Sequence, residues 1–243
     1  MGKLRALFLD IDDTLYSTSE FAAVARRAAM DAMIRYGLKM RIEDAMAELY
    51  EVISEFGSNY PYHYDRLLRR LPPSALPDVN PAIVVAAAIG AYHDTKYRSL
   101  FPFRDVPDVL HRIRNGTDLV IGVITEGLEI KQAEKLVRLG VVPYLTPGAI
   151  FISDQIGISK PNRKLYQRAC AEVGVRPSEA MYVGDHPEND IAPAKELGMI
   201  AVRHRWQGGK HAATEGPVAA DHEIRSFHEL IPILRDEFGF ADL

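Results

Sequence analysis

The segment with the clearest chemical potential lies near the N-terminus, where Asp10 and Asp12 follow an apolar run. Residues 4–9 are mostly apolar and predict a buried strand. Aspartates directly after such a strand would lie at the carboxyl edge of a sheet, where α/β proteins bind ligands. Carboxylates this close repel each other, and a divalent cation, which prefers oxygen ligands, would offset that repulsion best. For this segment alone, a solvent-exposed acidic turn after an edge strand is the alternative.

Two other polar side chains lie beside predicted elements, and each has a plain structural alternative. Thr125 follows a strand predicted over residues 119–124, where its hydroxyl and nearby backbone N–H groups could bind an anion. A threonine in this place could instead cap the next helix. Lys160 precedes a helix that Pro161 is expected to open, so its ammonium could neutralise a carboxylate or a phosphate. A lysine there could equally be exposed to solvent.

A second acidic pair follows a strand predicted over residues 181–183. Gly184 is expected to let the chain turn sharply, and Asp185 to point toward the same sheet edge as Asp10. Asp190 could reach back to that edge from the helix that follows. The chain therefore offers carboxylates from two strand ends for one site.

The order of predicted elements indicates how these segments are brought together. Residues 19–100 contain no convincing strand, and helices are predicted over 21–36, 42–56, 64–71 and 82–97. Helices and strands then alternate, with helices over 106–114, 128–139, 161–173 and 187–197 and strands over 119–124, 149–152, 181–183 and 200–202. This alternation predicts a doubly wound, Rossmann-like parallel sheet that the first strand must join. The expected domains are an α/β core of residues 1–16 and 101–243 and an inserted α-helical bundle, the cap, of residues 17–100.

Composition narrows the class of protein. The chain has 243 residues and a net charge of −4, which gives no strongly basic surface for nucleic acid. Its single cysteine, Cys170, excludes an intrachain disulfide and favours a reducing compartment, and its surroundings predict an inert core thiol. The longest apolar run, residues 82–91, falls short of the roughly 18 residues of a membrane span. We therefore expect a cytoplasmic protein without nucleic-acid or membrane partners.

In this order, and at these positions, the motifs resemble those of the haloacid dehalogenase superfamily of phosphotransferases, in the subfamily with a C1-type helical cap. The matching segments are Asp10-Ile-Asp12-Asp-Thr14, Thr125, Lys160-Pro161 with Tyr166, and Gly184-Asp185 through Asp190. The resemblance spans the whole chain. Glu126 departs from the asparagine or aspartate that is usual in the family, and it is left without a role.

The resemblance implies a Mg²⁺-dependent phosphatase that acts on a small phosphorylated metabolite. Asp10 would be the nucleophile and form an aspartyl-phosphate. Asp12 would protonate the leaving oxygen and later deprotonate water, with a pKa suited to both steps. Lys160 would offset the charge of the incoming phosphate and, with Thr125 and neighbouring N–H groups, hold its oxygens.

The resemblance also implies a ligand set for Mg²⁺. The Asp10 carboxylate, the Asp12 backbone carbonyl and Asp185 would bind the ion directly. Asp190 would act as a more distant or water-mediated ligand.

The cap carries an aromatic and basic cluster after Gly57, made up of Tyr60, Tyr62, His63, Tyr64 and Arg66. The stretch Gly57-Ser-Asn-Tyr-Pro-Tyr-His is similar to one in archaeal sugar-phosphate phosphatases of the glyceraldehyde 3-phosphate type. Tyr62, His63 and Arg66 are therefore expected to select the substrate, and packing within the cap is the equal alternative.

Other functions on this fold stay open. A phosphomutase would use the same residues, and a haloacid dehalogenase would attack carbon without needing a metal or an acid such as Asp12. A non-catalytic binding protein is the alternative of a different class, although Asp10, Lys160 and Asp185 are all retained. The sequence identifies neither the physiological substrate nor whether the protein is a monomer or a homodimer.

Overall fold

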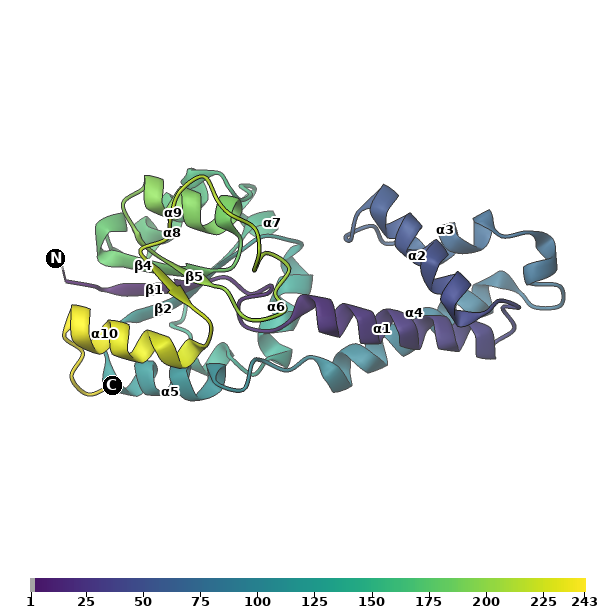
Figure 1. The fold of residues 1–243 in the computed structure, drawn as a ribbon, viewed down its shortest axis with the longest axis horizontal. Helices are drawn as coiled ribbons and strands as arrows, with labels where there is room; N and C mark the ends of the chain where they lie inside the picture. Colours follow the sequence, from purple (N-terminus) through teal and green to yellow (C-terminus); the bar gives the residue numbers. More distant parts are fainter. Residues whose placement is uncertain (1–2) are drawn as a thin grey trace. The chain divides into compact units, whose positions relative to one another are not determined.

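The structure is a computed structural model that describes residues 3–243, and its chain divides into two compact units (Figure 1). The α/β unit comprises the described residues up to Ser19 together with Phe101–Leu243. The helical unit comprises Glu20–Leu100. The helical segment is thus inserted into the α/β unit shortly after its first strand.

A six-stranded parallel sheet forms the centre of the α/β unit. Its strands are β1 (Ala6–Leu9), β2 (Val120–Thr125), β3 (Ile150–Ile152), β4 (Ala180–Gly184), β5 (Ile200–His204) and β6 (His222–Ile224), in the spatial order β3-β2-β1-β4-β5-β6. The order reverses at β1, which lies between β2 and β4 and is buried along its whole length. In a doubly wound sheet, the carboxyl ends of the strands around this reversal are where ligands bind. The predicted fold class is confirmed.

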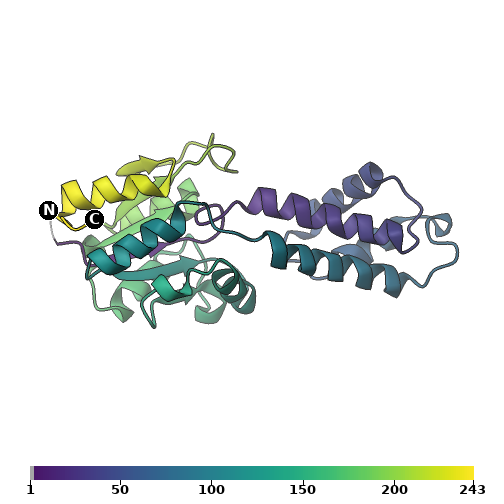
Figure 2. The same cartoon turned by 90° about the horizontal axis from the view of Figure 1, so that it is seen from below.

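Helices cover both faces of this sheet. The unit contains α5 (Val106–Gly116), α6 (Glu129–Arg138), α7 (Ser153–Ile156), α8 (Arg163–Glu172), α9 (Ala192–Glu196) and α10 (Leu230–Phe238). Figures 1 and 2 show α5 and α10 side by side on one face, with α8 and α9 on the other. The core on the α8 and α9 side includes Phe8, Phe151, Tyr166 and Tyr182. Burying such large side chains is the main contribution to the stability of this unit.

Shorter helical turns connect these elements. They are η1 (Pro73–Ala75), η2 (Val142–Tyr144), η3 (Pro177–Glu179), a π-helical turn η4 (Pro187–Ile191) and η5 (Phe227–Glu229). The turn η4 matters most here, because it joins the end of β4 to α9 and contains Asp190.

The helical unit is built from α1 (Thr18–Arg35), whose first two residues belong to the α/β unit, and from α2 (Ile42–Phe56), α3 (His63–Arg70) and α4 (Pro81–Ser99). The apolar spacing of α2 buries Ala45, Leu49 and Val52 in a core shared with the other three helices. Asn80 caps α4 through a hydrogen bond that its side chain accepts from the N–H of Ala82 at 2.9 Å. The unit therefore has a hydrophobic core of its own.

Several predicted elements differ in detail from those observed. The helix expected to open at Pro161 begins at Arg163, because the Asn162 side chain caps it by accepting from the N–H of Lys164 at 3.0 Å. The helix expected over residues 187–197 is divided between η4 and α9. Neither β6 nor α10 was predicted, and β6 is a three-residue strand in which Ile224 alone is buried.

The structure also bears on the predicted burial of Cys170 and on whether a helix could span a membrane. Cys170 is buried, and burial raises the pKa of its thiol to about 11, as suits an inert core position. Among the described residues, no helix is both long and apolar enough to cross a bilayer.

Candidate active site

The sheet brings the predicted strand-end residues to one edge. Leu9, the last residue of β1, lies opposite Val123 on β2 and Val183 on β4, and β2 and β4 end shortly afterwards at Thr125 and Gly184. The backbone N–H of Asp10 donates to the carbonyl oxygen of Val183 at 2.9 Å and fixes the first aspartate beside the end of β4. The parallel register therefore positions Asp10 at the reversal of strand order.

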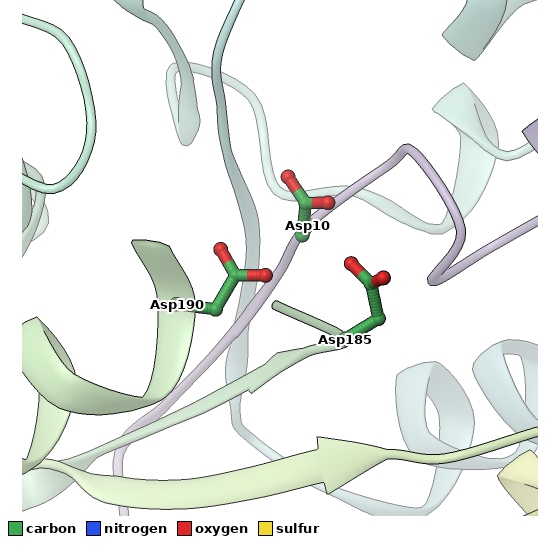
Figure 3. Close-up of side chains that lie close together, drawn as sticks. All are labelled: Asp10, Asp185 and Asp190. Carbon is green, nitrogen blue, oxygen red and sulfur yellow. The ribbon is translucent and has the colours of Figure 1, made fainter. Parts of the chain in front are cut away.

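Three buried aspartates face one another at this edge (Figure 3). Asp10 follows β1, Asp185 follows β4, and Asp190 returns from η4. One carboxylate oxygen from each lies within 4.8 Å of the others. Three carboxylates at this spacing form a concentrated negative charge that needs a cation nearby.

Lys160 supplies part of that positive charge. Its buried Nζ lies 2.6 Å from Oδ1 of Asp10 and 2.7 Å from Oδ1 of Asp190. The same ammonium donates to the hydroxyl of Tyr182 at 2.6 Å, so it has three acceptors for its three protons. Burial alone would lower the pKa of Lys160, but Asp10 and Asp190 raise it well above its ordinary value. Lys160 is therefore a permanent cation, not a proton donor, at this site.

Tyr182 and Gly184 explain how Asp190 reaches the cluster. The hydroxyl of Tyr182 lies 3.1 Å from Oδ1 of Asp190 and donates to the carbonyl of Ile124 at 3.0 Å. The backbone N–H of His186 donates to the other oxygen of Asp190 at 2.9 Å. A Cβ on Gly184 would lie 2.6 Å from the Cβ of Asp190. The expected role of Gly184 was wrong, since it belongs to the extended strand β4 and serves close packing against Asp190, not a sharp turn.

The remaining charge imbalance appears in the pKa values of two carboxyl groups. Burial raises the pKa of Asp10 to about 7, although Lys160 acts in the opposite direction. Burial, with the negative charges of Asp190 and Asp10, raises the pKa of Asp185 to about 9. The Oδ2 atom of Asp185 is buried without a hydrogen-bond partner among the described residues. A hard divalent cation bound by oxygen ligands would offset this repulsion, so these residues fit Mg²⁺.

The side chain of Asp12 lies apart from the acidic cluster and has its own partners. Nζ of Lys135 lies 2.7 Å and 2.6 Å from its two oxygens. The hydroxyl of Tyr16 donates to Oδ1 at 2.5 Å, and Nε2 of Gln132 donates to Oδ2 at 3.1 Å. Burial alone would raise the pKa of Asp12, but Lys135 and these donors lower it below its ordinary value. In this arrangement Asp12 is a carboxylate, which suits a proton acceptor more than a proton donor.

Sequence reasoning did not find Lys135, Gln132 or Tyr16. Tyr16 lies four positions after Asp12, which was the one available signal. Gln132 and Lys135 lie in α6, more than a hundred residues from Asp12 in the chain, and read as ordinary polar residues of an amphipathic helix.

Thr125 ends β2 with its hydroxyl fully buried, and no partner for that oxygen is found in residues 3–243. The neighbouring backbone N–H groups, which were expected to bind an anion, donate to side chains of the protein. Gly127 donates its N–H to Oγ of Ser153 at 2.9 Å, and Glu129, the first residue of α6, donates to Asp154 at 3.0 Å. The expectation that the N–H groups beginning this helix bind an anion is wrong for these two, whereas the Thr125 hydroxyl stays a candidate.

Glu126, which had no assigned role, has a partner. Its carboxylate accepts a hydrogen bond from Oγ of Ser159 at 3.0 Å. This bond ties the loop after β2 to the loop that carries Lys160, and it holds the negative charge of Glu126 on that side.

The residues expected to select the substrate lie in the helical unit, where each contacts the neighbouring residue Tyr60. Nε of Arg66 donates to the hydroxyl of Tyr60 at 2.8 Å, and its guanidinium lies 5.2 Å from the ring centre of Phe56. Nε2 of His63 lies 2.8 Å from the carbonyl of Gly57. Tyr62 packs its ring edgewise on Tyr60 yet is 59% exposed. These contacts support the packing alternative and leave Tyr62 the most accessible member.

Comparisons with known proteins agree with this geometry. A family model described as haloacid dehalogenase-like hydrolase matches residues 4–198. A glyceraldehyde 3-phosphate phosphatase of Methanopyrus kandleri is 41% identical over 96% of this chain and 98% of its own length. A glyceraldehyde 3-phosphate phosphatase of Pyrococcus furiosus is 39% identical over 98% of this chain and 96% of its own length. The crystal structure of a HAD phosphatase from Thermococcus onnurineus, 22% identical, superposes with a TM-score of 0.68 over 99% of this chain and all of that one.

Proposed function

The chain belongs to the haloacid dehalogenase-like hydrolases, and from this membership we propose that it hydrolyses sugar phosphates, triose phosphates among them, through a covalent intermediate on Asp10. It is a phosphatase, as are the relatives that match nearly its whole length. The single observation that carries the proposed mechanism is the buried cluster of Asp10, Asp185 and Asp190 around Lys160.

Asp10 is the proposed nucleophile. Its oxygen would bond to phosphorus while the bond from phosphorus to the leaving oxygen breaks. Lys160 lies against Asp10 and would offset the repulsion between that carboxylate and the phosphate dianion. The Thr125 hydroxyl, buried without a partner in the described part of the chain, would donate to a phosphoryl oxygen.

Asp12 is the proposed acid and base. It would protonate the leaving oxygen, and in the second half of the reaction it would take a proton from the water that attacks the aspartyl-phosphate. Its contacts with Lys135 and Tyr16 favour the carboxylate, which is the form required in that second half.

Mg²⁺ is the proposed metal. The carboxylates of Asp10 and Asp185 and the backbone carbonyl of Asp12 would hold it. Both oxygens of Asp190 already accept hydrogen bonds, which supports an indirect role for this residue. When bound, the ion supplies positive charge that stabilises the charge developing on the transferred phosphoryl group.

Tyr62, His63 and Arg66 are proposed to influence which substrate is accepted. A cytoplasmic location is also proposed, because a single free cysteine suits a reducing compartment. A dehalogenase would need neither the acidic cluster nor Asp12 with its own set of donors, and we favour phosphate hydrolysis over the dehalogenase alternative for this reason. We favour it over the mutase alternative because the relatives that match nearly the whole chain are named phosphatases.

The test is a screen of purified protein against phosphorylated metabolites, with Mg²⁺ or with EDTA, and with Asp10→Asn as the control for contaminating phosphatase. We expect phosphate release from glyceraldehyde 3-phosphate and related sugar phosphates in Mg²⁺ alone. The proposal fails if no compound is hydrolysed at any Mg²⁺ concentration, or if Asp10→Asn is equally active.

A further inference from the structure

The carboxylate of Asp12 is held from one side by a helix of the same unit. Lys135 contacts both of its oxygens, at 2.7 Å and 2.6 Å, and Gln132 donates to one of them at 3.1 Å. The hydroxyl of Tyr16 completes the set at 2.5 Å. All these residues belong to the α/β unit.

The helix α6 is itself fixed to the end of β2. Nε2 of Gln132 donates to the backbone carbonyl of Glu126 at 2.6 Å, directly after Thr125. Gly127 leaves room for that side chain, because a Cβ there would collide with Nε2 of Gln132. The N–H of Glu129 is bound by Asp154 at 3.0 Å. Since Gln132 and Lys135 are three residues apart, they share one face of this anchored helix.

The chemistry of the partners matches one form of Asp12. An ammonium has donors only, and the Tyr16 hydroxyl and Gln132 amide also donate to Asp12. A carboxylate is an acceptor only, so both of its oxygens are satisfied by this set. These contacts fix the orientation of the carboxylate. They also fill its four acceptor positions, so the attacking water must take the place of one donor before Asp12 can accept its proton.

We propose that Lys135 is a positioning residue that acts through Asp12, orienting its carboxylate to take the proton of the water that hydrolyses the aspartyl-phosphate. The inference rests on the proposed function. In this step the water oxygen forms a bond to phosphorus, and the bond from phosphorus to Asp10 breaks with its electrons returning to the Asp10 carboxylate. The proton from water passes to Asp12. Loss of Lys135 should therefore slow release of phosphate from the protein more than formation of the phosphorylated protein.

The test separates these two halves by using Lys135→Met with p-nitrophenyl phosphate and saturating Mg²⁺. The p-nitrophenolate leaving group needs little protonation, so kcat/KM, which reports formation of the intermediate, should stay close to that of the unaltered protein. We expect kcat to fall about 10- to 100-fold, by analogy with the loss of residues that orient metal ligands through hydrogen bonds. Stopped-flow traces should show a burst approaching one p-nitrophenolate per active site before the slow steady state.

Two further variants complete the experiment. Lys135→Arg keeps the charge and can bind both carboxylate oxygens, so it should restore part of kcat. Lys131→Met changes an exposed lysine one turn earlier in α6 and should alter neither parameter.

Equal falls of kcat and kcat/KM in Lys135→Met, or no fall in either, would overturn the positioning role. Absence of turnover in the unaltered protein is a distinct result, and it would overturn the proposed function together with this inference.

Discussion

Asp10 and Asp12 are two residues apart in the chain, yet they lie in opposite electrostatic surroundings. Asp10 shares a buried site with Asp185 and Asp190, and Lys160 is the cation that contacts it. Asp12 contacts Lys135 and accepts hydrogen bonds from two further side chains. The pKa of Asp10 is consequently raised to about 7, whereas that of Asp12 is lowered.

The difference shows that the partners, not the strand end itself, decide what each carboxylate can do. Excess negative charge around Asp10 creates a demand for a metal ion. Donors around Asp12 stabilise a base. Two carboxyl groups whose surroundings separate their pKa values are a common basis for dividing catalytic roles.

The strongest test of this comparison removes the Asp10 charge. Asp10→Asn should lower kcat by about 10⁴-fold or more, because an amide is a poor nucleophile and a poorer metal ligand. Release of phosphate from a sugar phosphate measures the effect, with the folded state checked by circular dichroism. Substantial activity in the folded variant would remove Asp10 from the nucleophile role.

The next test asks whether the two sites differ in kind. Asp12→Asn should lower kcat about 10²- to 10⁴-fold without changing the Mg²⁺ requirement, since its backbone carbonyl is unaltered. Asp185→Asn should mainly weaken Mg²⁺ binding, so that added Mg²⁺ partly restores its activity. Activity is measured as a function of Mg²⁺ concentration for both. Superimposable normalised titration curves would contradict the separate roles.

Much of the Asp10 site was accessible from sequence because Asp10 and Asp185 directly follow strands and Thr125 ends one. A parallel sheet brings such strand ends to one edge whatever the loops do, so the types of residue at these three positions were informative. The Asp12 site was not accessible in this way. Lys135 reaches Asp12 only because of the way α6 is rotated and anchored. In the sequence it is one of several polar residues of an amphipathic helix, and nothing in that pattern indicates a contact with Asp12.

The packing role of Gly184 could not be predicted from the sequence for a similar reason. Gly184 looked like a turn residue, but its role depends on Asp190 returning to within van der Waals contact. The predicted fold class survived such errors, because alternating strands and helices determine it. The short strand β6 did not give enough apolar pattern to be recognised.

The helical unit, which holds none of the proposed reacting groups, provides a further contrast with the Asp10 and Asp12 sites. Arg66→Ala in the helical unit should leave the Asp10 and Asp12 sites intact, but it removes the bond to Tyr60. If Arg66 also contacts substrate, kcat/KM should fall unequally, and the loss of one charge-assisted hydrogen bond corresponds to about 1.5–3 kcal/mol for a sugar phosphate. An aryl phosphate should lose less. His63→Ala is the companion variant, and equal losses for all substrates would indicate that the cluster only packs the unit.

The last expected effect is on stability, not activity, and concerns the pH dependence of unfolding in protein freed of metal by EDTA. The pKa values of Asp10 and Asp185 are raised to about 7 and about 9, so the folded protein binds more protons than the unfolded chain above their ordinary pKa values. The free energy of unfolding should therefore fall as pH rises, from about pH 4 to about 7 through Asp10 and from about pH 4 to about 9 through Asp185, with a slope of at most about 1.4 kcal/mol per pH unit for each group. Asp12, whose pKa is lowered, contributes stability that is lost only as pH falls below its ordinary value. Urea unfolding at several pH values measures this slope.

Asp185→Asn should make the pH dependence of the unfolding free energy less steep. Mg²⁺ should oppose the loss of stability at high pH, because the ion competes with protons for the same oxygens. An unchanged slope in Asp185→Asn would show that the acidic cluster is not the source of the pH dependence.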